Sequence, residues 1–247
     1  MKTRTLIAFY IIAALPAALL AAAPVDRQIE DAANNSYNYK AVLDGRVSVK
    51  SSDGAVTLTG TVADKADKTL AEDTVKSLPG VVSVDNEIGV DSTYPKYSDA
   101  WIGLKIHSLL LVRANVSATD TKVAVQDGVV TLTGTVSSDT QRDLTEAYVK
   151  TIDHVKSVKD ELVVKTPEPD QDSAAVAVDD ASVTAQVKYA LFSDSTTSAM
   201  RTKVTTDHGV VIVTGEAASN AEKDSVTQLA KSIRGVKSVR NMMTVRP

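Results

Sequence analysis

The residues best suited to chemistry in this chain are its three histidines, because cysteine is absent. His107, His154 and His208 are far apart and fall at different positions of a repeated sequence pattern. A metal centre or a nucleophile and base pair needs such side chains to converge, usually with cysteines or clustered carboxylates. We therefore expect no metal site and no cofactor.

Two pairs of glycines could instead suggest a phosphate loop. Residues 53–62 read DGAVTLTGTV and residues 127–136 read DGVVTLTGTV. A phosphate cradle packs its glycines into one strand-to-helix turn beside a lysine, whereas an alternating apolar stretch separates these glycines. We interpret the first glycine of each pair as a hairpin turn and the second as the end of the next strand.

Paired carboxylates are a third candidate for catalysis. Asp160-Glu161 and Asp179-Asp180 lie in solvated or linker sequence, where nothing would raise the pKa of a general acid. Because the sequence offers no other group of candidate catalytic residues, we expect a protein that is not an enzyme and has no small-molecule substrate.

The glycine pairs belong to a longer repeat that determines the fold. Residues 53–90, 127–164 and 208–245 align without a gap. In each copy apolar residues alternate around the glycine turn, recur at helical spacing, and alternate again, and a further helix precedes each hairpin. The sequence predicts an α+β fold of three tandem αββαβ modules.

The expected organisation of the chain is a signal peptide over 1–23, modules over 25–92, 98–165 and 180–247, and an acidic, proline-containing linker over 166–179. The linker is longer than the joint between the first two modules, so we expect the third module to be the more loosely attached.

The first residues have the layout of a secretory signal. Lys2 and Arg4 precede an apolar run that ends in three alanines. A retained membrane anchor is the alternative, because Pro24 follows the best cleavage position. Removal of residues 1–23 leaves 25 basic and 31 acidic side chains, a net charge of −6, which is unlike a nucleic-acid-binding protein.

The repeat resembles the BON domain. The resemblance rests on V-T-L-T-G-T-V and on G-V-V-S-V-D-N-E-I-G-V at 80–90, with G-V-K-S-V-R-N-M-M-T-V at 235–245. It implies small αββαβ modules in the periplasm of Gram-negative bacteria, acting at phospholipid or envelope surfaces. The first copy departs from the pattern in a weak leading helix broken by Asn34-Asn35, and the third lacks T-V after its second glycine.

The stretch SDAWIGLKIHSLLLVRANV at 98–116 has two apolar faces when drawn as a helix. One face, with Ile102, Ile106, Leu109 and Leu110, suffices to pack on a sheet. The stretch also resembles the lead helix of the second domain in double-BON outer-membrane lipoproteins, which is implicated in binding anionic phospholipid. That resemblance implies lipid contact by Trp101, Leu104, Lys105, Ile106 and Leu111. The alternative is that the second face, with Trp101, Leu104, Leu111 and Val112, packs against a neighbouring module.

A basic group in the third module offers a second possible contact with an anionic surface. It consists of Lys231, Arg234, Lys237 and Arg240. The alternative is that this group docks on the first module, which holds 12 acidic and 7 basic residues. The sequence therefore favours an envelope-stress protein that binds anionic phospholipid, and a periplasmic scaffold or chaperone that binds other envelope proteins is the rival interpretation.

Overall fold

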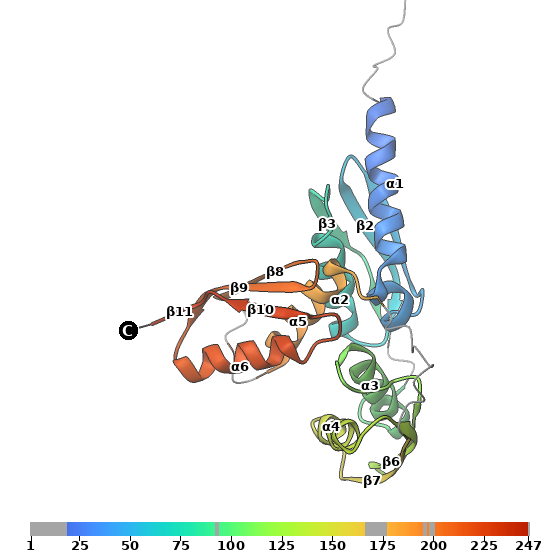
Figure 1. The fold of residues 1–247 in the computed structure, drawn as a ribbon. Helices are drawn as coiled ribbons and strands as arrows, with labels where there is room; N and C mark the ends of the chain where they lie inside the picture. Colours follow the sequence, from blue (N-terminus) through green and yellow to red (C-terminus); the bar gives the residue numbers. More distant parts are fainter. Residues whose placement is uncertain (1–18, 92–93, 166–176, 195–196, 198–200, 247) are drawn as a thin grey trace, which may run out of the picture.

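The structure is a computed structural model that describes residues 19–91, 94–165, 177–194, 197 and 201–246 (Figure 1). Three modules follow one another along the chain, each with the predicted order of helix, two strands, helix and strand. The first contains α1 (Leu19–Asn35), a π-helical turn η1 (Asn38–Val42), β1 (Val47–Ser52), β2 (Ala55–Val62), α2 (Lys65–Lys76), β3 (Ser83–Asn86) and β4 (Gly89–Val90). The second contains α3 (Asp99–Val112), β5 (Thr121–Gln126), β6 (Val129–Val136), α4 (Asp139–Lys150) and β7 (Ser157–Val164). The third contains α5 (Asp180–Ser193), β8 (Thr202–Asp207), β9 (Val210–Ala217), α6 (Asn220–Lys231), β10 (Ser238–Asn241) and β11 (Thr244–Val245).

Each module is a small mixed sheet covered by two helices. The second strand is central, antiparallel to the first strand and parallel to the last. In the first module, Val49 of β1, Leu58 of β2, Ile29 of α1 and Val75 of α2 are all buried in one core. Because alternate strand residues enter that core, the period-two pattern of the sequence translates directly into one buried face of the sheet.

The repeated glycines are structural, as the sequence predicts. Asp127 and Gly128 both have positive φ, 52° and 78°, which is the conformation of a two-residue hairpin turn that follows the twist of the strands. The second glycine, Gly134, has φ 119°, and a Cβ there would lie 2.0 Å from the backbone oxygen of Asp120. No other residue fits that position without moving the chain.

An aspartate of each lead helix binds the hairpin turn of its own module. Asp99 accepts hydrogen bonds from the backbone N–H groups of Asp127 and Gly128, at 2.7 and 2.8 Å. Asp26 and Asp180 bind the equivalent amides of the first and third modules. The turn amides are therefore already occupied by carboxylates, which removes the basis for a phosphate site at these glycines.

The last strand differs between modules. In the third module it is interrupted between β10 and β11, where the Asn241 side chain accepts from the Met243 amide and donates to the Lys223 carbonyl of α6. Asn86 does the same between β3 and β4. In the second module β7 is continuous and pairs with β6 along its whole length.

The lead helix of the first module ends where the sequence indicates a break. Helix α1 stops at Asn35, and the chain then forms the turn η1. Most of the expected signal peptide, residues 1–18, lies outside the described residues. Within the described part of the chain, no helix is long and apolar enough to cross a membrane.

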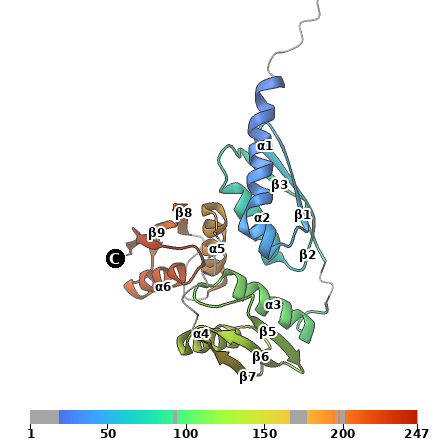
Figure 2. The same cartoon turned by 45° about the vertical axis from the view of Figure 1, so that its right-hand side comes forward.

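The three modules pack against one another, which corrects the expectation of a loosely attached third module. Helix α5 lies against α2 of the first module, and the C-terminal end of α3 contacts the third module (Figure 2). Linker composition is a poor guide here because contacts of α5, and of Asp179 at the end of the linker, hold the third module in place. Asp179 accepts from the Tyr37 amide at 2.7 Å, and Ser182 accepts from the Asn38 amide at 3.0 Å.

Candidate lipid-contact surface

Helix α3 is fixed by its cap and by one apolar face. The Ser98 side chain caps the helix by accepting from the Trp101 amide at 3.2 Å. Ile102, Ile106 and Leu110 are at most 1% exposed in the core of the second module. In this arrangement Ile106 contributes to the core and presents no surface to a lipid.

An aromatic group lies at the N-terminal end of α3. The Tyr97 ring meets Trp101 edge-on, with 5.3 Å between centroids, and stacks on His154 at 3.8 Å. The ammonium group of Lys96 lies 4.6 Å from the centre of the Tyr97 ring. We call Lys96, Tyr97, Trp101 and His154 the aromatic end.

Sequence reasoning identified only Trp101 within the aromatic end. Tyr97 is 41% exposed, and Trp101 is partly exposed. Tyr97 and His154 both adopt left-handed backbone conformations, with φ 68° at each. His154 occupies the position at which a glycine follows the equivalent helix in the other two modules. In the sequence this position indicated only the end of a helix, so the stacking of His154 on Tyr97 was not predicted.

Lys105 is engaged in an ion pair between modules. Its ammonium group lies 2.5 Å from Oδ2 of Asp64, the residue that caps α2. Burial pushes the pKa of Asp64 up, but the hydrogen bond and charge of Lys105 hold it below its usual value. Burial likewise opposes the charge on Lys105, yet Tyr189 and Asp64 raise its pKa. Lys105 thus holds the first two modules together.

The second apolar face of α3 is divided between two environments. Leu111 and Val112 pack in a cluster with Tyr37 and Leu70 of the first module and Ala185 of the third. Leu104 is partly exposed and belongs to none of the core clusters of the described residues. The alternative of packing between modules therefore holds for the C-terminal half of this face.

The four basic residues of the third module have different surroundings. Arg234 donates to backbone carbonyls of the second module, including those of Leu111 and Val116, at 2.9 Å each. The alternative of docking is thus correct for Arg234, but the partner is the end of α3 and not the acidic first module. Lys231, Lys237 and Arg240 are exposed.

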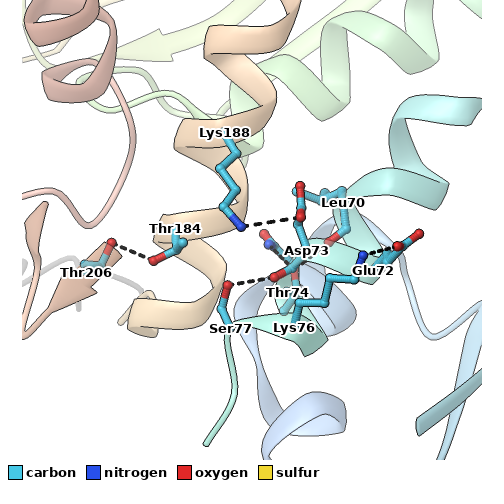
Figure 3. Close-up of polar contacts among 10 residues, drawn as sticks. Leu70, Glu72, Asp73, Thr74, Lys76, Ser77, Thr184, Lys188 and Thr206 are labelled. Atoms are coloured by element: carbon cyan, nitrogen blue, oxygen red, sulfur yellow. Dashed lines mark hydrogen bonds and ion pairs between the residues drawn. The ribbon is translucent and has the colours of Figure 1, made fainter. Parts of the chain in front are cut away.

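An ion pair joins helices α2 and α5 at the edge of their contact. Lys188 of α5 lies 3.5 Å from Asp73 of α2 (Figure 3). One turn earlier on α5, Thr184 is hydrogen-bonded to Thr206 of β8 at 2.8 Å. One helix thus contributes to its own module and to the junction with the first.

One of the three histidines, His208, lies beside two aspartates at the hairpin turn of the third module. Asp180, Asp207 and His208 have possible ligand atoms within 4.8 Å of one another, a grouping that the sequence did not suggest. The Asp180 carboxylate is occupied by the His208 and Gly209 amides, and Asp207 and His208 are exposed. Among the described residues, no histidine is hydrogen-bonded to a serine or threonine hydroxyl.

The paired carboxylates are engaged in similar ways. Asp160 accepts from the Leu162 amide at 2.9 Å and lies near Arg142, and Asp179 caps α5. Asp160 thus stabilises the backbone of a strand, and Asp179 stabilises the N-terminus of a helix.

Comparison with known protein families finds three matches to the BON domain, at residues 25–92, 98–166 and 179–247. The chain belongs to the BON-domain family. A BON relative, osmotically-inducible protein Y of Escherichia coli, is 33% identical over 156 residues, which are 62% of this chain and 77% of the relative. Outer membrane lipoprotein DolP of Haemophilus influenzae is 34% identical over 116 residues, 44% of this chain and 58% of the relative. The BON modules thus occur here in a chain whose relatives are osmotic-stress and outer-membrane proteins.

Proposed function

We propose that this protein is a non-enzymatic periplasmic protein that binds anionic phospholipid at the bacterial envelope. One observation carries the proposal, the aromatic end, where Tyr97 and Trp101 meet beside Lys96. Amphipathic rings are favoured at the head-group level of a membrane, and lysines near the surface are attracted to anionic lipid. The names of the relatives support an envelope location.

The roles within α3 follow from the exposure of each side chain. Trp101 and Tyr97 would enter the head-group region. Leu104, about one helical turn after Trp101, would lie at the border of that region. Ile106 and Leu111 would support the contact from beneath by anchoring α3 in the core and at the junction. Since Lys105 is paired with Asp64, Lys96 replaces it as the leading cation of this surface.

The basic residues of the third module form a second proposed contact. Lys231, Lys237 and Arg240 are exposed, whereas Arg234 is used to dock the module. Each exposed cation would contribute up to about 1 kcal/mol of attraction to an anionic surface at low salt. Their contribution should therefore vanish in high salt before that of the aromatic rings does.

Vesicle flotation at low and high salt tests the proposal. We expect the K96S/Y97S double variant to bind vesicles containing anionic lipid at least fivefold more weakly than the parent chain, because it loses a cation and a ring. F192S is the matched control, since Phe192 is 75% exposed on α5, far along the chain from the aromatic end. Equal weakening by both variants would contradict a specific surface on α3.

The scaffold alternative is favoured by a different feature, the edge strand β7. This strand is unbroken over eight residues, and Val163 on it is 55% exposed. Extended edges can accept a further strand from another protein. If V163K abolishes suppression of aggregation of an unfolded outer-membrane client while vesicle binding is absent in the parent chain, the scaffold function replaces the lipid function.

A further inference from the structure

A cavity of about 70 Å³ lies where the three modules meet. Leu70 of the first module and Leu109, Val112 and Ile152 of the second give it apolar walls. Polar groups come from all three modules, among them Asp67, Lys105 and Gln186. The cavity thus exists only when the modules are docked.

Asp67 carries a carboxylate that no donor reaches among the described residues, although the residue is only 9% exposed. The equivalent position in the other modules shows what is missing. Gln141 accepts from the Ser137 amide at 2.7 Å, and Glu222 accepts from the Ala218 amide at 2.6 Å, each completing a helix cap. Aspartate is one methylene shorter than either, so its carboxylate stays at the cavity.

The charge of Asp67 is not balanced by its surroundings. Lys105, which lines the same cavity, is already paired with Asp64. Burial and the negative charge of Asp64 raise the pKa of Asp67 to about 6, and Lys105 and Arg46 offset this only in part. At neutral pH Asp64 and Asp67 together carry two negative charges beside the single positive charge of Lys105.

Gln186 supplies a second acceptor without a donor. The residue is 1% exposed, and its Oε1 has no hydrogen-bond partner among the described residues. Its Nε2 donates to Asn38 Oδ1 at 2.6 Å, and Asn38 Nδ2 donates to the Ser182 carbonyl, which can only accept and so fixes the orientation of both amides. A buried acceptor without a donor costs free energy that a ligand with N–H groups would recover.

We infer that this cavity binds a short primary alkylammonium ion, with its charged group directed to Asp67 and Gln186 and its carbons against the apolar walls. The ammonium group has three donors and a single positive charge, which match two acceptors and one excess carboxylate. Since a cavity needs about 10–15 Å³ to hold one water molecule, a volume of about 70 Å³ admits a fragment of a few heavy atoms. The ion would be held by all three modules and would stabilise their docking.

Titration of the isotope-labelled full chain with propylammonium chloride, followed by NMR, tests the inference. We expect saturable shifts at the Gln186 side-chain amide and the Asp67 backbone amide, with a dissociation constant on the order of 1 mM for so small a ligand. Sodium chloride at equal ionic strength and 1-propanol should not produce them. Equal shifts with either control, or shifts spread over exposed carboxylates, would overturn the site, as would their absence.

Two variants of Asp67 distinguish a specific carboxylate from a general effect of charge. D67N removes the charge, and D67E retains it but should fold back onto the Ala63 amide, as Glu222 does in the third module. Both should bind propylammonium at least tenfold more weakly while keeping the parent spectrum elsewhere. E72Q, which removes a carboxylate of the same helix that pairs with Lys76 inside the first module, is the control and should bind like the parent chain. Unchanged binding in D67N would overturn the proposal.

The pH dependence gives an independent check. The groups that act on Asp67 are Asp64 on its own helix, Lys105 on α3 and Arg46 before β1, and Tyr189 of α5 acts on Lys105. Because Asp67 takes up its proton near pH 6, binding should be about tenfold weaker at pH 5 than at pH 7.5, while the ligand stays charged. A pH-independent affinity would contradict the role of this carboxylate.

Discussion

Replacing Arg234 with alanine should release the third module from the second. The guanidinium donates to the carbonyls of Leu111, Arg113 and Val116 at 2.9, 3.0 and 2.9 Å, and more distantly to Leu110. These carbonyls belong to the last turn of α3 and the residues after it, where the helix dipole also favours a cation.

The size of the effect follows from these bonds. A hydrogen bond from a charged donor contributes about 1.5–3 kcal/mol, but Arg234 is only partly buried and water replaces part of what is lost. We therefore expect R234A to weaken docking by about 3 kcal/mol and not by the sum of its bonds. R234K should recover little, because an ammonium cannot reproduce the planar fork of donors.

Spin labels provide the assay because the chain has no native cysteine. Cysteines at exposed Lys122 of β5 and Lys203 of β8 would report the distance between the second and third modules. We expect a narrow distribution in the parent chain and in the R240A control, and a broad one in R234A. A narrow distribution in R234A with an unchanged unfolding midpoint would refute the account of Arg234.

Two further predictions concern single modules. G134A should destabilise the second module by about 3 kcal/mol or more, because its Cβ would meet the Asp120 carbonyl at a positive φ; an unchanged urea midpoint at Trp101 would contradict this. D67N should stabilise the chain by about 2 kcal/mol at pH 7.5. The raised pKa of Asp67 means that its favourable contribution is complete below about pH 4 and is lost as pH rises through about 6, so the advantage of D67N should shrink on acidification. A pH-independent difference between the two chains in urea titrations would refute this assignment.

The fold could be predicted because its determinants are local. Alternating apolar residues define the strands, and Asp127-Gly128 defines a turn whose backbone angles few other pairs adopt. Three copies of the same pattern then remove the ambiguity of any one copy. The contact of Asp99 with that turn was missed, since its signal is only an aspartate that lies 27 or 28 residues before the turn in each copy.

The docking of the modules could not be predicted from the same patterns. Arg234 and Arg240 look alike in sequence, yet only Arg234 lies against the carbonyls of α3. A charge count gives the sign of a patch but not which member forms bonds across an interface. Asp67 is a similar case, because its significance lies in a missing methylene relative to Glu222 and in neighbours from other modules.

Trp101 is the only tryptophan in the chain, so its emission reports directly on the proposed membrane contact. The measurement is a titration of the chain without residues 1–23 with neutral and then anionic vesicles, at low and high salt. The lipid account predicts a blue shift that is confined to anionic vesicles and weakened by salt, as the partly exposed indole enters the head-group region. An emission maximum that is already blue in buffer and unmoved by any vesicle would place Trp101 in a packed interface and contradict lipid binding by α3.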